Sequence, residues 1–211
     1  MKPRLITLEG GEGVGKSTNL AFIESHLKAQ GVALITTREP GGTTLGESIR
    51  GLLLDGDPMT AEAELLLVFA ARAEHLATVI RPALESGQWV LCDRFTDASY
   101  AYQGGGRGVS LDRIAWLETW IQAGLNPDLT LLLDAPIAVG MGRARARGPG
   151  DRFEQETDPF FERVRAAYLA RAQAAPHRVC RIDAAKPLAL VQAAIAAALD
   201  GLLRATDGVS P

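Results

Sequence analysis

The chain has 211 residues, of which 47% are hydrophobic, enough for one α/β domain with a sizeable core. The formal net charge of −3 gives no general attraction to nucleic acid. Cys92 and Cys180 form no metal-ligand pattern and are expected to be reduced thiols of a cytoplasmic protein. No apolar run approaches the roughly 20 residues of a membrane helix. We therefore expect neither nucleic acid nor a membrane as a partner.

Hydrophobic periodicity predicts five strands that alternate with helices. Short apolar runs mark the strands, and apolar residues at helical spacing mark the helices. The predicted strands are residues 4–8, 32–37, 88–94, 128–134 and 178–183. The predicted helices are 16–30, 45–54, 60–85, 95–102, 111–123, from after 134 to about 145, 160–174 and 188–204. Pro82 is expected to end or kink the third helix, and the tail 205–211 to be frayed.

This alternation predicts an α/β fold with a five-stranded parallel sheet and helices on both faces, a three-layer sandwich. We expect a single domain over residues 1–211. In such sheets, ligands bind beyond the carboxyl ends of the strands. The loops that follow the first four strands should therefore share one edge of the sheet: 10–17, 38–43, 93–94 and the segment after 134.

The loop after the first predicted strand reads Gly-Gly-Glu-Gly-Val-Gly-Lys-Ser and fits the pattern G-x-x-x-x-G-K-[ST]. Glycines at Gly10 and Gly15 let backbone N–H groups point inward at a phosphate, and the following helix N-terminus adds partial positive charge. Lys16 can reach the outer phosphates, and the Ser17 hydroxyl can ligate Mg²⁺. The strand–loop–helix context favours a nucleoside triphosphate site over a chance glycine-rich turn.

Charged residues follow the second and third predicted strands. Asp93 can hold Mg²⁺ through water, as acidic residues at strand ends do in P-loop proteins. Arg94 and Arg38 can each bind a phosphate through a planar fork. Surface ion pairs or a solvated turn would also place charges here. Two arginines on the ligand edge nevertheless predict a second phosphate site.

Phe69 and Arg72 are three residues apart and share a helix face. An aromatic plate beside a forked donor would suit a planar base. Alone, the pair is a weak signal, and an ordinary core residue is the default interpretation of Phe69.

The segment from about 140 to 153 is predicted to be a cationic lid. It carries Arg143, Arg145, Arg147 and Arg152, with breaks at 148–150. A solvated helix face is the alternative. However, the phosphate-binding loop has only one basic residue and also carries Glu12, so charge on a transferring phosphoryl group needs further cations. We expect Arg152, and next Arg147, to act mainly in the transition state.

The three histidines, His26, His75 and His177, belong to no motif. We expect each to be a helix-surface or loop residue rather than a catalytic base.

Several motifs in order closely resemble those of bacterial thymidylate kinases, from Ile6 to about Leu199. The matching stretches are the phosphate-binding loop, Thr37-Arg-Glu-Pro-Gly-Gly-Thr43, Phe69-Ala-Ala-Arg72, Asp93-Arg94, Ala101-Tyr-Gln-Gly-Gly-Gly-Arg107, Pro127-Asp-Leu-Thr130 and Asp151-Arg-Phe-Glu154. The resemblance implies a P-loop NTPase-like fold and transfer of a phosphoryl group from ATP·Mg²⁺ to dTMP, giving dTDP and ADP on the way to dTTP. It also implies a homodimer.

The resemblance also implies roles for individual residues. ATP would be bound by Gly10, Gly11, Glu12, Gly13, Val14, Gly15, Lys16, Ser17, Thr18 and Arg143. The residues that would bind dTMP are Glu12, Arg38, Phe69, Arg72, Arg94, Ser99, Tyr102 and Gln103. In that site Phe69 would stack on thymine, and Arg72 would donate to its carbonyl. Lys16, Arg94, Arg147 and Arg152 would be catalytic, and Ser17 and Asp93 would hold Mg²⁺.

Three other functions compete with this interpretation. The first is a P-loop kinase of another deoxynucleoside monophosphate, such as dUMP, dCMP or dGMP. A GTPase switch would carry a guanine-reading Asn/Thr-Lys-x-Asp motif, and the sequence has none. A nucleotide-regulated binding protein without turnover would not need Lys16, Asp93 and the lid arginines together.

Overall fold

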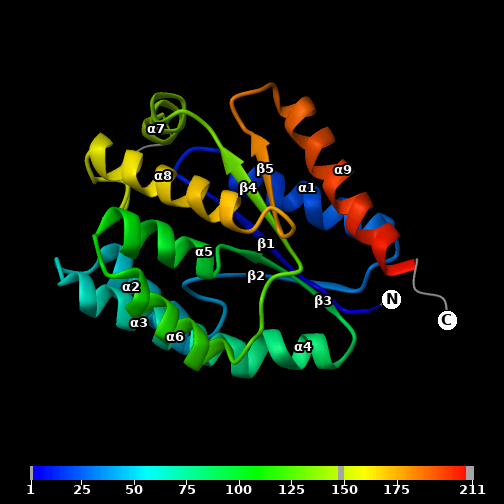
Figure 1. Ribbon diagram of the computed structural model, residues 1–211, viewed down its shortest axis with the longest axis horizontal. Helices are drawn as coiled ribbons and strands as arrows, with labels where there is room; N and C mark the ends of the chain where they lie inside the picture. The colour runs from blue at the N-terminus through cyan, green and yellow to red at the C-terminus, as the bar shows by residue number, and fades with distance from the viewer. Residues whose placement is uncertain (1, 147–149, 208–211) are drawn as a thin grey trace.

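The computed structural model describes residues 2–146 and 150–207. Predictions for Arg147 and for residues 208–211 lie outside the described residues. Five parallel strands form one sheet in the order β2-β3-β1-β4-β5 (Figure 1). They are β1 (Leu5–Gly10), β2 (Leu34–Arg38), β3 (Trp89–Asp93), β4 (Leu129–Asp134) and β5 (Val179–Asp183). The predicted parallel α/β sheet is confirmed.

Helices cover both faces of this sheet. On one face, α1 (Lys16–Ala29) and α9 (Leu188–Asp207) pack on the even-numbered side chains of β1. On the other face lie α4 (Arg81–Glu85), α5 (Thr96–Ser99) and α8 (Asp158–Ala174). Because the central strand is covered on both sides, all six of its residues are buried, which is why it is a nearly continuous apolar run.

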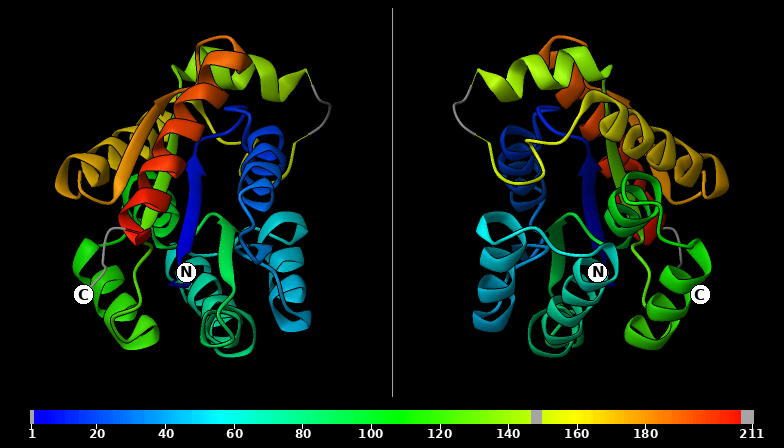
Figure 2. Two further views of the ribbon diagram at one scale, coloured as in Figure 1. Left: turned by 90° about the vertical axis from the view of Figure 1, so that its right-hand side faces the viewer. Right: turned by 90° about the vertical axis from the view of Figure 1, so that its left-hand side faces the viewer.

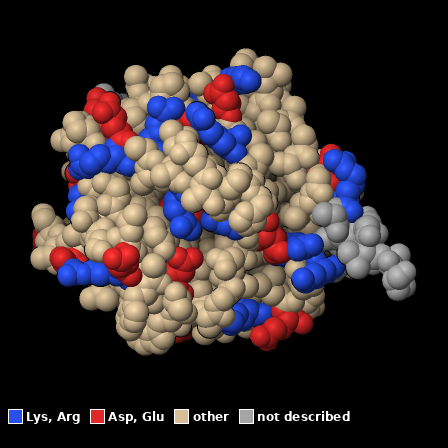
Figure 3. All heavy atoms as spheres, in the orientation of Figure 1, with Lys and Arg blue, Asp and Glu red and all other residues tan. Residues whose placement is uncertain are grey.

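Three of the remaining helices pack together. Two of them, α2 (Thr44–Asp55) and α6 (Leu111–Gln122), pack against α3 (Ala61–His75). Figure 2 shows α7 (Ile137–Arg145) passing above the carboxyl ends of the strands, beside the loop that follows β1. Acidic and basic side chains are interspersed over the face seen in Figure 3. Within the described ranges, no helix has the length and apolar character needed to cross a membrane.

Two predicted helices differ from the structure in detail. The helix predicted over 60–85 is α3, a π-helical turn η1 (Leu76–Ile80) and then α4, in whose first turn Pro82 lies. The helix does not end before Pro82, because Ile80 and Arg81 both keep helical backbone angles, and the π-helical turn η1 directly precedes the segment that contains the proline.

The helix predicted over 95–102 continues as a π-helical segment, η2 (Tyr100–Gly106), through three glycines. A Cβ atom on Gly105 would lie 2.8 Å from the Arg163 carbonyl oxygen, and one on Gly106 would lie 2.5 Å from the Phe160 ring. These glycines therefore allow α8 to approach closely rather than end the helix.

Candidate active site

The loop between β1 and α1 has the backbone of a phosphate cradle. Gly10, Gly13 and Gly15 all have positive φ angles, which side chains with a Cβ rarely adopt. At Gly13 a Cβ would lie only 1.8 Å from the Gly140 carbonyl oxygen, so the loop packs directly beneath α7. The Lys16 ammonium donates to the carbonyls of Gly10 (3.3 Å) and Gly11 (3.0 Å). Loss of solvation, and then the charge of Arg94, lowers the pKa of Lys16.

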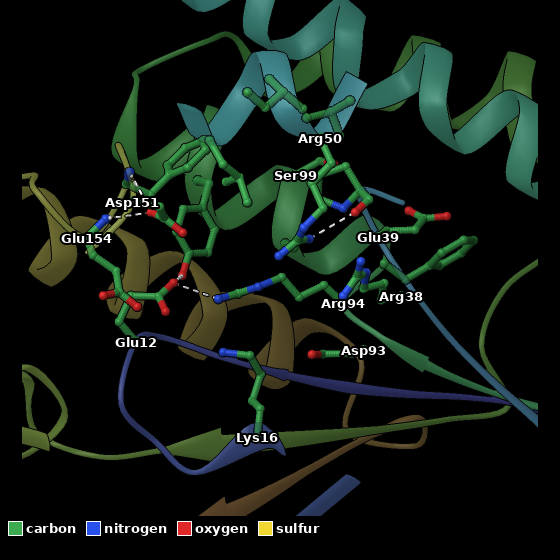
Figure 4. A pocket seen from close by; sticks show the side chains of 18 of the residues that line it. Glu12, Lys16, Arg38, Glu39, Arg50, Asp93, Arg94, Ser99, Asp151 and Glu154 are labelled. Atoms are coloured by element: carbon green, nitrogen blue, oxygen red, sulfur yellow. Dashed lines mark hydrogen bonds and ion pairs between the residues drawn. The ribbon is translucent and has the colours of Figure 1, made fainter. Parts of the chain in front are cut away.

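A cavity of about 220 Å³ opens beyond the carboxyl ends of β1, β2 and β3 (Figure 4). It collects side chains from the phosphate-binding loop, from α2, α3 and α5, from η2 and from the end of the predicted lid. The lining includes Glu12, Lys16, Ser17, Arg38, Glu39, Arg50, Val68, Arg72, Asp93, Arg94, Ser99, Tyr102, Gln103, Asp151, Phe153 and Glu154.

Arg94 joins the loop to the rest of the cavity. Its Nη1 donates to the Gly10 carbonyl (2.8 Å) and to the Tyr168 hydroxyl (3.2 Å), and its Nη2 donates to Glu12 Oε1 (2.7 Å). The guanidinium lies 4.8 Å from the centre of the Tyr102 ring. The Arg94 guanidinium is thus held where the phosphate-binding loop meets the rest of the cavity.

Asp93 offers a carboxylate oxygen to the same space. Its Oδ1 is buried and has no hydrogen-bond partner among the described residues, and Figure 4 shows the carboxylate opposite Lys16. Ser17 lines the cavity from the first turn of α1. Hydroxyl and carboxylate oxygens are the ligands that Mg²⁺ prefers, so these two residues fit the predicted metal.

Arg72 lines the cavity and is held on almost all sides, but one of its donor nitrogens has no partner in the described structure. The side chain is 1% exposed; Nε donates to Glu39 Oε2 (2.7 Å) and Nη2 to Ser99 Oγ (3.1 Å). Its guanidinium lies 4.6 Å from the centre of the Phe69 ring and 5.1 Å from that of Phe95. Nη1 is buried without a partner in the described structure. A buried donor of this kind is costly unless a ligand completes it.

The structure does not bring Phe69 to the cavity lining. It is 2% exposed and packs with Leu65 and Tyr100, while Val68 lines the cavity instead. Residues three and four apart both share a helix face with Arg72, so spacing could not choose between positions 69 and 68. Phe69 lies beneath Arg72 as a support.

The other predicted acceptor residues come together. The Tyr102 hydroxyl donates to Glu12 Oε1 (2.7 Å), and the Gln103 amide donates to Glu64 Oε1 (2.9 Å). Arg38, whose side chain is 52% exposed, donates from Nη2 to Glu47 Oε2 (2.7 Å) at the cavity edge. The charged fork of Arg38 is therefore oriented by the first turns of α2.

The lid arginines occupy different surroundings from one another. Arg143 Nη1 donates to the Ala184 carbonyl (3.0 Å), on the loop after β5. Arg152 does not line the cavity: Nη2 donates to the buried carboxylate of Glu64 (2.8 Å) and Nε to the Leu53 carbonyl (2.8 Å). The cation expected to act in the transition state is thus tied to α2 and α3 in this structure.

Sequence reasoning missed four charged residues of the cavity: Glu39, Arg50, Asp151 and Glu154. Arg50 lies inside α2, where the apolar spacing predicts a helix but indicates no function for a single arginine. Its Nη1 donates to the Pro40 carbonyl (2.9 Å). Asp151 and Glu154 were part of a matching motif, and that motif was the signal that could have found them.

The geometry fits the class of P-loop kinases of small nucleotides: the phosphate-binding loop borders one side of the cavity, and Arg38, Arg72 and Arg94 line the other. The family model named thymidylate kinase matches residues 8–195, so the chain belongs to the thymidylate kinase family, as its motifs predicted.

Similar proteins agree over nearly the full length. The chain is 60% identical over 200 residues to a thymidylate kinase of Methylococcus capsulatus, covering 95% of this chain and 96% of that protein. It is 59% identical over 210 residues to a thymidylate kinase of Pseudomonas entomophila, covering 99% and 100%. The crystal structure of thymidylate kinase from Ehrlichia chaffeensis matches with a TM-score of 0.77 at 32% identity, covering 95% of this chain and 99% of that one.

Proposed function

We propose that this chain transfers the γ-phosphoryl group of ATP to dTMP, giving dTDP and ADP, with the described cavity as the acceptor site. Family membership supports the reaction. The observation that carries the acceptor assignment is Arg72: a buried, charged side chain that lines the cavity and has one nitrogen, Nη1, without a partner in the described structure. Such a group suits a base with a carbonyl acceptor and disfavours one that presents an amino group there.

On the donor side, the backbone N–H groups of residues 10–18 cradle the ATP phosphates, and Lys16 exchanges its two carbonyl contacts for phosphate oxygens. Ser17 would hold Mg²⁺ through its hydroxyl, and Asp93 would hold it through water. The metal, when bound, neutralises charge on the transferring phosphoryl group. Arg143 lies where it can reach the nucleotide from α7.

On the acceptor side, Arg38 and Arg94 bind the dTMP phosphate through their forks. Glu12 and Tyr102, already hydrogen bonded to each other, contact the sugar together with Gln103. Arg72 donates to a thymine carbonyl from its place beside Ser99. Val68 forms the apolar wall beside the base, and Phe69 supports Arg72 from below.

We also propose that the enzyme is a homodimer in the cytoplasm. Leu66, Trp116 and Trp120 are each more than half exposed on neighbouring parts of α3 and α6. An apolar face of this kind, edged by Glu62 and Arg113, suits a second copy that presents the same face. The two unpaired cysteines suit a reducing compartment.

The test is ADP release measured with a panel of nucleoside monophosphates. We expect the highest kcat/KM with dTMP. We expect dUMP to be poorer by about 1–3 kcal/mol in transition-state binding, because the 5-methyl group fills an apolar contact. Faster phosphorylation of dCMP or dGMP than of dTMP would refute the base assignment.

A further inference from the structure

His75 is the last residue of α3 and is completely buried, contrary to the expectation of a surface or loop residue. Its ring makes two specific contacts. Nδ1 lies 3.0 Å from Glu39 Oε1, and Nε2 lies 2.7 Å from Thr37 Oγ1. The histidine therefore links the end of α3 to the end of β2 and the residue after it.

The partners determine which ring nitrogen donates. An ionised carboxylate only accepts, so His75 Nδ1–H donates to Glu39, and in the neutral ring Nε2 accepts from the Thr37 hydroxyl. Glu39 also accepts from Arg72 Nε, through its other oxygen. His75 and Arg72, three residues apart on one helix, thus hold the same carboxylate from both sides.

This arrangement controls where Arg72 points. Nε is fixed by Glu39 and Nη2 by Ser99, which leaves Nη1 as the nitrogen without a partner in the described structure. Glu39 is 4% exposed, and its two carboxylate oxygens are held by different partners. His75 supplies the second of these contacts.

The turn that carries Glu39 is also folded onto the histidine ring. A Cβ atom on Gly42 would lie 2.6 Å from His75 Nε2 and 2.6 Å from Thr37 Oγ1. The ring thus fills the space beneath the turn, and its shape and its Nδ1–H group both bear on the position of Glu39.

We propose that His75 is a positioning residue for base selection: by fixing Glu39, it aims Arg72 Nη1 at the 4-carbonyl of the acceptor base. This inference rests on the proposed dTMP site. The nucleotide that probes it is 5-methyl-dCMP, which keeps the methyl group of thymine but presents an amino group in place of that carbonyl. A rigid donor rejects this amino group, whereas a donor that can swing away tolerates it.

The experiment compares kcat/KM for dTMP and for 5-methyl-dCMP in the full-length enzyme. The measured ratio is kcat/KM for dTMP divided by kcat/KM for 5-methyl-dCMP. We expect His75→Leu to lower this ratio by about tenfold, mainly through a higher KM for dTMP, with the KM for ATP unchanged. His75→Asn, which keeps a donor near the Nδ1 position, should restore most of the ratio. His177→Leu, at an exposed histidine, is the matched control and should leave the ratio unchanged.

A folded His75→Leu variant with the wild-type ratio would overturn the proposal. An equal loss with both nucleotides, or no rescue by His75→Asn, would also overturn it, because the ring would then be only a packing element. If His75→Leu does not fold, Thr37→Val replaces it: a lowered ratio supports the proposal and an unchanged ratio overturns it. Arg72→Ala distinguishes failure of the positioning role of His75 from failure of the proposed base site. If Arg72→Ala leaves the ratio unchanged, the proposed base site itself is refuted.

Discussion

Arg94 holds a left-handed backbone conformation, with φ of 67°, that residues with a Cβ rarely adopt. Strain of this kind persists only where the surroundings hold it, and here Gly10, Glu12 and Tyr168 all hold the side chain. The conformation brings the fork from the end of β3 back toward the phosphate-binding loop.

Arg94→Ala is expected to raise the KM for dTMP by about 10- to 100-fold, the cost of losing charge-assisted hydrogen bonds to a phosphate. The KM for ATP should change far less. Lys16→Ala is the contrasting variant, which should remove most turnover while leaving dTMP binding measurable. Steady-state kinetics with each nucleotide varied in turn, and titration of each variant, make the comparison. Equal losses for both nucleotides in Arg94→Ala would contradict the assignment.

Glu9 is fully buried one residue before the phosphate-binding loop. It accepts hydrogen bonds from the Phe95 N–H (2.7 Å) and the Tyr168 hydroxyl (2.8 Å). Burial raises the pKa of Glu9 to about 8, and the Asp97 charge adds to this, while Arg94 and the two hydrogen bonds act in the opposite direction.

This pKa predicts a pH dependence of stability. Between the ordinary pKa of 4.5 and about 8, the folded state binds more protons at Glu9 than the unfolded state does. The free energy of unfolding should therefore fall as pH rises through this window, by at most about 1.4 kcal/mol per unit. Glu9→Gln should lack this contribution. Urea unfolding of the wild type and of Glu9→Gln from pH 5 to 8 tests this prediction. If the unfolding free energies of the two proteins change in parallel with pH, the Glu9 carboxyl does not have the raised pKa.

Among the elements, Glu64 on α3 connects three parts of the chain. Its carboxylate accepts from Gln103 on η2, from Arg107 just after η2, and from Arg152 in the segment before α8. The Arg152 N–H also donates to the Leu54 carbonyl at the end of α2 (3.1 Å). The end of the predicted lid is thus anchored to the helices that line the acceptor side.

Arg152→Ala distinguishes anchoring from the transition-state role that the sequence suggested. If Arg152 anchors the end of the lid to α2 and α3, the variant should lose about 1–3 kcal/mol of stability. This loss is smaller than that expected for breaking an isolated buried ion pair, because Arg107 still holds Glu64. The KM for dTMP should rise as Gln103 loosens. Thermal unfolding and steady-state kinetics test this, with Arg152→Lys as the charge-keeping control. A large fall in kcat with unchanged stability and dTMP affinity would instead support the catalytic role.

At the scale of the whole molecule, the proposed dimer depends on the exposed apolar face of α3 and α6. The ring centres of Trp116 and Trp120 lie 5.3 Å apart on this face, with the rings tilted by 45° and both well exposed. Trp116→Glu should convert the expected dimer into monomers, because a charge there meets the same charge on the second copy. Leu190→Glu, at a comparably exposed leucine on α9, is the control. Sedimentation equilibrium tests both; a monomeric wild type, or a dimeric Trp116→Glu, would contradict the assignment.

The sequence by itself determined the sheet, the phosphate-binding loop and the family, because each depends on local chemistry. Apolar runs form covered parallel strands, and Gly10 and Gly15 adopt backbone angles that other residues avoid. The strand-end charges Arg38, Asp93 and Arg94 could be predicted to meet for the same reason, since parallel strands end at one edge.

Only the tertiary structure decided which side chains face one another across long stretches of chain. Helical spacing left Val68 and Phe69 equivalent, and packing against Leu65 and Tyr100 chose between them. The pairing of His75 with Glu39 spans 36 residues and that of Arg152 with Glu64 spans 88. A buried charge takes whichever partner the fold brings within hydrogen-bond distance, and sequence spacing carries no information on that distance.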